Sequence, residues 1–178
     1  MTNNDILKRI RYTFDYSDVE MIDLFNMGGE EVTRAQISDW LKKELDDNFR
    51  ELNDKSLATF LNGLVVERRG PRADGKQMEP EDRLNNNIIL KKIKIALNLK
   101  TDDILDLFKS IHKKLSPHEL SSFLRNHKQS QYRPFQDQYL RNLLTALQQK
   151  YRGKNDESGN WKKASSKALF LLVTLMIR

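Results

Sequence analysis

The sequence predicts an all-α fold built from two tandem copies of one four-helix unit. The first observation is an internal repeat: a shift of 83 residues aligns 3–70 with 86–153 without a gap, and 18 of the 68 aligned pairs are identical. The second is apolar residues at helical spacing in both copies. The third is a content of only seven Gly and four Pro in 178 residues, which disfavours a turn-rich β fold. A gap-free repeat of this length indicates a duplicated structural unit.

The first two helices of each copy follow from a polar start and an apolar stripe. The first is predicted to begin at an Asn pair, Asn3-Asn4 or Asn86-Asn87, because Asn side chains suit a helix N-cap. A shorter second helix is predicted after Ser17 and Thr101, where acidic residues favour a helix N-terminus.

The third and fourth helices have equally distinct starts. The third is predicted after Thr33 and Ser116, and Pro117 then occupies the first helical position, where its missing N–H is tolerated. The fourth is the longest and carries one apolar stripe, with Asp54 and Asp137 as its predicted N-caps. Its predicted ends are Gly70 and Gly153.

Two segments lie outside the repeat. Residues 71–85 contain Pro and Gly turn signals and are predicted to form a linker loop. Residues 154–178 begin with a polar stretch and are predicted to form a flexible tail. The apolar run at its end, residues 168–177, has ten residues, about half of what a membrane span needs. Whether this run docks on the body stays open.

Composition argues against several classes of site. The chain has no Cys, which excludes thiol catalysis and disulfides, and its N-terminus has no apolar core of signal-peptide length. The only Gly pair is followed by two Glu, which would repel a phosphate. The three His residues do not have the spacing of a metal-binding helix. We therefore expect a cytoplasmic protein that is not an enzyme and uses no cofactor or metal.

Several runs resemble a known family. NDILKRIRY, ISDWLKKE, LATFLNGLVVERRG and LNNNIILKKIKIALNLKTDDI occur here in the order found in the YehS-like family of uncharacterised bacterial proteins, a tandem domain of unknown function. The resemblance covers about residues 3–153. It implies a bacterial, cytoplasmic, helical protein with no assigned reaction, and it supplies no catalytic residues.

Charge separates the two copies. Residues 3–70 have a net charge of −4, whereas residues 86–153 have a net charge of +8. The basic face of the second copy is a candidate contact surface for nucleic acid or another anion. Its candidate residues are Lys91, Lys92, Lys94, Lys113, Lys114, Arg125, Tyr132 and Arg133, with Lys100 and Lys128 in the same basic set and Phe135 as a possible stacking partner for bases. The alternatives are a solvated helix face or attraction between the two copies.

Two polar pairs recur just before the long helix: Arg50 with Asp54, and Arg133 with Asp137. We interpret them as structural, with the Asp as a helix cap and the Arg bonded to nearby carboxylates or carbonyls. Only a deep polar pocket lined by these four residues would favour an enzyme.

The sequence therefore predicts a non-catalytic interaction module with an unknown protein partner. The alternative is a nucleic-acid-binding protein that uses the basic face of residues 86–153. The oligomeric state and the packing of the two copies stay open.

Overall fold

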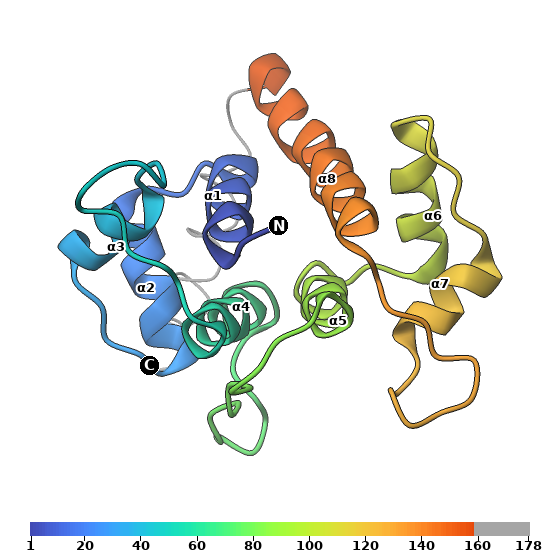
Figure 1. Cartoon of the computed structure of the whole chain (residues 1–178), viewed down its shortest axis with the longest axis horizontal. Coiled ribbons are helices and arrows are strands. Elements are labelled where there is room, and N and C mark those ends of the chain that lie inside the picture. Colours follow the sequence, from blue (N-terminus) through green and yellow to red (C-terminus); the bar gives the residue numbers. More distant parts are fainter. Residues whose placement is uncertain (159–178) are drawn as a thin grey trace, which may run out of the picture.

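The computed structural model describes residues 1–158, which form eight helices and no strand (Figure 1). The predicted all-α fold with two repeated helical units is confirmed. The first copy contains α1 (Asn3–Phe14), α2 (Asp18–Gly28), α3 (Arg34–Leu41) and α4 (Asp54–Arg69). The second contains α5 (Asn86–Ala96), α6 (Thr101–Ser110), α7 (Pro117–Leu124) and α8 (Asp137–Ser158).

Four of the eight described helices begin with a capping box, in which an N-cap side chain and the side chain three residues later each accept a backbone N–H. Ser17, Thr33 and Ser116 cap α2, α3 and α7 in this way, as the sequence predicted for each. At α6 the N-cap is Lys100, not Thr101, and because a Lys side chain accepts no hydrogen bond, the Asp103 carboxylate alone binds the Lys100 N–H.

The predicted caps of the first and fourth helices were wrong. Thr2 and Asn85 cap α1 and α5, so both Asn pairs lie inside the helices. The N-cap of α4 is Asn53, and Asp137 is the first residue of α8. The Asn and Asp side chains in question make contacts with distant segments instead, as described below.

The predicted stop at Gly153 was also wrong, because α8 continues to Ser158. Gly70 does end α4, with φ at 81°, and Pro71 after it cannot continue a helix. Gly153 is followed by Lys154, so nothing compels the chain to leave the helix there. The remainder of the predicted tail, from residue 159, lies outside the described residues.

The two copies pack by exchanging their first helices. The main partner of α1 is α8 of the second copy, and the main partner of α5 is α4 of the first. Figure 1 shows α1 beside α8 and α4 beside α5 at the centre, with α2 and α3 on one side and α6 and α7 on the other. This arrangement answers the question of packing that the sequence left open.

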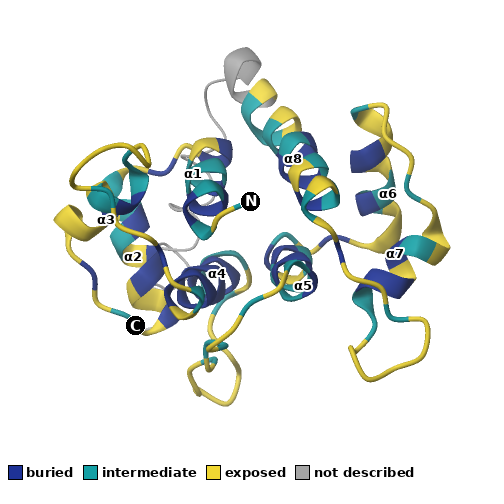
Figure 2. Cartoon of the chain, in the orientation of Figure 1, coloured by how far each residue is buried: buried dark blue, intermediate teal, exposed yellow. Residues whose placement is uncertain are grey.

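The exchange produces one continuous core and matching polar contacts. Buried apolar residues from both copies form a single cluster, and Figure 2 shows the buried faces of α4 and α5 meeting at the centre. At the α1–α8 contact, Arg9 donates to Thr145 over 2.8 Å. At the α4–α5 contact, Lys92, which aligns with Arg9, donates to Asn62 over 2.6 Å. Because Asn62 aligns with Thr145, the two contacts are related by pseudo-twofold symmetry.

Two glycines bring α2 and α4 unusually close in the first copy. A Cβ atom added to Gly63 would lie 1.7 Å from the Leu24 carbonyl oxygen, and one added to Gly28 would lie 2.0 Å from the Thr59 carbonyl oxygen. The aligned residues of the second copy are Ala146 and Ile111. Since these carry side chains, α6 cannot approach α8 in the same way.

Candidate functional site

The identical Asn4 and Asn87 organise the loop before each long helix. The Asn4 Nδ2 donates to the carbonyl oxygens of Trp40 and Arg50 over 2.9 and 2.8 Å, and its Oδ1 accepts from the Leu52 N–H over 3.0 Å. Asn87 repeats this pattern with the aligned residues Phe123, Arg133 and Phe135 over 2.9, 2.8 and 2.9 Å. Both Asn residues are buried, so their side chains take the place of water as hydrogen-bonding partners of the loop backbone.

Arg50 and Arg133 are therefore held in place through their backbone. The carbonyl of each accepts from the buried Asn, and both side chains are exposed. The Arg50 guanidinium donates to the Phe49 carbonyl oxygen over 2.9 Å. The Arg133 guanidinium lies near Glu119 and helps to lower the pKa of that carboxyl, although the Ser116 N–H and hydroxyl contribute more.

Asp54 and Asp137 join the starts of helices from both copies. Asp54 accepts from the Asn3 side chain over 2.7 Å and from the Leu84 N–H over 2.9 Å. Asp137 accepts from the Asn86 side chain over 2.8 Å and from the amino group of Met1. Asp54 thus connects the start of α1 to the segment just before α5, and Asp137 connects the start of α5 to the segment just before α1. We regard this as a structural latch between the copies.

The amino group of Met1 and the Asn86 side chain hold the pKa of Asp137 below its usual range. A carboxyl with a lowered folded-state pKa stabilises the fold above its unfolded pKa, and this contribution is lost as pH falls through the folded value. We therefore expect Asp137→Asn to be less stable than the parent protein at neutral pH. The difference should shrink as pH falls below about 3.8, the usual Asp value. Urea unfolding of both proteins across this range measures the effect, and a difference that stays constant with pH would contradict the latch.

The first two candidate anion contacts are internal. Lys91 donates to the Arg125 carbonyl oxygen over 3.2 Å, at the C-terminal end of α7, as Lys8 does to Lys42 in the first copy over 2.7 Å. Lys92 has a side chain only 12% exposed and forms an ion pair with Glu81 over 2.9 Å besides its bond to Asn62. Both lysines therefore stabilise the body and are not free to contact an external anion.

The aromatic candidates differ from each other. Phe135 is buried and packs against Phe123 and Tyr139, with ring centroids 5.1 and 5.8 Å apart. The suggestion that Phe135 stacks on bases was therefore wrong. Tyr132, in the same loop, is half-buried.

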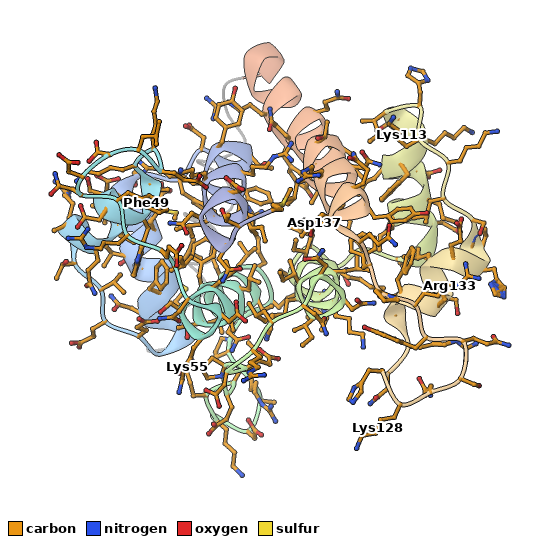
Figure 3. The ribbon with its side chains drawn as sticks, in the orientation of Figure 1. Phe49, Lys55, Lys113, Lys128, Arg133 and Asp137 are labelled. Atoms are coloured by element: carbon orange, nitrogen blue, oxygen red, sulfur yellow. The ribbon has the colours of Figure 1, made fainter. Side chains whose placement is uncertain are left out.

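The remaining candidates gather at the end of the molecule formed by α6, α7 and the loop before α8. We call this the basic end. Figure 3 shows Lys113, Lys128 and Arg133 on that side, opposite Phe49 of the first copy. Its residues are Lys109, Lys113, Lys114, Arg125, Lys128 and Arg133, of which Arg125 is partly buried and the others are exposed. Lys94 lies on α5, outside these elements, and Lys100 is the exposed N-cap of α6. Lys109 was not among the candidates, although its position on the exposed face of α6 would have predicted it.

The basic charge of the second copy is not neutralised internally. Among the described residues, no ion pair joins two members of 86–153. Within the described part of the chain, Lys92 and Arg152 are the only basic residues of this copy in an ion pair, and their partners, Glu81 and Asp15, lie outside this copy. The prediction that the charge difference holds the copies together therefore applies to the Arg152–Asp15 contact alone among the described residues, because Glu81 lies in the linker.

A groove of about 670 Å³ lies between α2, the start of α4 and the linker. Glu30, Asp54, Glu79 and Asp82 give it acidic character, and Lys55 is its one basic residue. Asp54 is already bound by two donors, and Arg50, Arg133 and Asp137 do not line the groove. The polar pocket that would have favoured an enzyme is thus not formed by those four residues.

Residues 1–158 contain no group of three or more His, Asp or Glu side chains placed to hold a metal ion. His112, His118 and His127 are each exposed. No helix in this range has the length and apolarity to cross a membrane.

Comparison with known proteins gives a family but no activity. A family model described as "Protein of unknown function (DUF1456)" matches residues 3–70 and again residues 86–153. The chain is 39% identical over 147 residues to the "Uncharacterized protein YehS" of Escherichia coli (strain K12), covering 83% of this chain and 94% of that protein. No solved structure matches. The repeated helices, the paired Asn clamps and these matches together show that the chain belongs to the DUF1456 family of YehS-like proteins.

Proposed function

We propose that this protein is a non-catalytic binding module that holds the phosphate backbone of a nucleic acid against its basic end. The observation that carries the proposal is the concentration of unpaired basic side chains on α6, α7 and the following loop. Their exposure leaves them available to a polyanion. A protein that neutralises several phosphates gains affinity by releasing condensed counterions.

The kind of residue at the basic end favours backbone contact over base reading. Four of its six residues are Lys, whose long flexible side chains act as point charges and do not define a planar hydrogen-bonding geometry. Tyr132 is half-buried and Phe135 is inside the core, so stacking on bases contributes little. We therefore expect binding that depends weakly on base sequence and strongly on salt.

The absence of catalysis is part of the same proposal. An acid–base pair needs carboxyls whose surroundings separate their pKa values. In the acidic groove, Asp54 is used to connect helices, and Glu30 accepts a hydrogen bond from Ser56 over 3.0 Å. Both carboxylates, Asp54 and Glu30, therefore have a structural role in these hydrogen bonds. A cytoplasmic location is compatible with a nucleic-acid partner and stays a prediction.

The test is a fluorescence-anisotropy titration of labelled single- and double-stranded oligonucleotides across a salt series. The variant is Lys114→Glu/Lys128→Glu, because both lysines are exposed and make no internal contact that folding would need. We expect at least a tenfold loss of affinity at low salt and a salt slope smaller by about 2. Reversal of Lys91 or Lys92 would be uninformative, since both stabilise the fold.

The matched control is Lys43→Glu/Lys76→Glu, which changes the net charge equally at exposed residues of the first copy and the linker. It should bind nearly as well as the parent protein. Salt-independent binding, no binding at low salt, or an equal loss in the control would each contradict the proposal.

A further inference from the structure

The loop between α3 and α4 presents an apolar side chain directly to solvent. Leu45 is 98% exposed, far more than any other large apolar residue among those described. It is surrounded in the sequence by Glu44, Asp46 and Asp47, which are exposed as well. Figure 1 shows this loop at the end of the molecule opposite α6 and α7. Leu45 thus presents an apolar side chain beside acidic residues, and a surface with complementary apolar and basic groups would bind this combination.

The basic end has an open hollow with both polar and apolar lining. It has a volume of about 330 Å³ and is lined by Thr101, Pro117, Ser121, Leu124, Arg125 and Gln129. Leu124 and Pro117 supply apolar surface, and Arg125 supplies positive charge. A cavity of roughly 150 Å³ is enough for benzene, so a leucine side chain fits this hollow.

The corresponding place in the first copy is occupied by ion pairs. Asp18 and Arg34 align with Thr101 and Pro117, and they form an ion pair of 3.9 Å. Lys42 aligns with Arg125 and is bound to Asp39 over 2.6 Å. In the second copy the residue that aligns with Asp39 is Ser122, so Arg125 has no such carboxylate beside it.

The hollow is found in the second copy, whereas the exposed Leu45 is found in the first. Lys128 aligns with Leu45, so the apolar projection belongs to the first copy alone. After duplication, one copy thus carries an apolar projection with acidic neighbours, and the other carries a hollow with basic neighbours. The two features cannot meet within one chain, because they lie at opposite ends of the molecule (Figure 1).

We propose that this surface pair joins copies of the same chain head to tail, with Leu45 of one molecule in the hollow of the next. Asp46 and Asp47 would then lie against Arg125 and Lys128. Such a contact uses two different surfaces, so it produces a ring where the rotation closes and an open chain where it does not. This association does not rest on nucleic-acid binding. Because it covers part of the basic end, it would compete with a bound nucleic acid.

The test is analytical ultracentrifugation of the full chain over a concentration series at low and high salt. The parent protein should self-associate at low salt and dissociate as salt screens the contact. Leu45→Ala should weaken association at least about tenfold, as truncation of a central interface residue does. Ile95→Ala is the matched control, because Ile95 is 55% exposed and lies on α5, outside the proposed contact.

Mixing two defective variants gives a decisive result. Leu45→Ala retains a normal hollow, and Arg125→Glu retains a normal acidic loop, so each should be monomeric alone. Their mixture should form a one-to-one complex and nothing larger. At concentrations too low for self-association, Leu45→Ala should also bind nucleic acid as the parent protein does, which separates this proposal from the previous one. A monomeric parent protein at all concentrations and low salt, unchanged association of Leu45→Ala, or no complex in the mixture would overturn it.

Discussion

Replacement of Gly63 by alanine is expected to destabilise the protein by about 3 kcal/mol or more. The added Cβ atom would lie 1.7 Å from the Leu24 carbonyl oxygen, which belongs to the backbone of α2 and cannot rotate away. Helix α2 would have to move away from α4, and the packing of Phe25 on Phe60, with centroids 5.3 Å apart, would be disturbed. Thermal unfolding should show a midpoint lower by roughly 10 °C.

The control is Gly153→Ala, the same substitution at a helical glycine with open space around its Cβ position. Alanine is the better helix former, so this variant should be as stable as the parent protein or more stable by up to about 1 kcal/mol. Equal stability of the Gly63 variant and the parent protein would show that the close crossing of α2 and α4 is not as described.

Replacement of Asn4 or Asn87 by alanine should cost about 3–5 kcal/mol in each case. Each substitution removes three hydrogen bonds and leaves two carbonyl groups and one N–H of the loop without their partner. An unsatisfied buried backbone group costs about 1–3 kcal/mol, and partial entry of water limits the sum. Urea unfolding monitored by circular dichroism measures the loss.

Asn26→Ala is the control for these clamps, because Asn26 is an exposed helical residue. It should change stability by less than about 0.5 kcal/mol. The pseudo-symmetry also predicts similar losses for Asn4→Ala and Asn87→Ala. A small loss in one and a large loss in the other would mean that the two clamps are not equivalent in energy.

The sequence predicted the helices better than their ends. Periodicity places apolar residues on one face whatever the partner is, so the eight helices were visible. The caps of the first and fourth helix of each copy were not, because Asn3, Asn4 and Asp54 are equally suited to a cap and to a distant contact. The contacts that these residues make depend on the packing of α1 on α8 and of α5 on α4. The spacing of apolar residues within one helix does not indicate which other helix its apolar face will pack against.

The site was predicted in the same uneven way. The charge difference pointed to the second copy, but it could not separate Lys91 and Lys92, which are held inside, from Lys113 and Lys114, which are exposed. One signal was available: Lys91 is identical to the aligned Lys8 of the acidic copy, which indicates a shared structural contact. The hollow at Leu124 required the folded loop and had no signal in the sequence.

The most direct test of the central claim is a ¹H–¹⁵N NMR titration of the whole protein with a short oligonucleotide at low salt. The account predicts that shifted amides fall on α6, α7 and residues 125–133, and that amides of α2 and α3 stay unchanged. The concentration should be kept below the range of any self-association. Shifts confined to the first copy, or no shifts at all, would contradict the assignment of the basic end as a phosphate-binding surface.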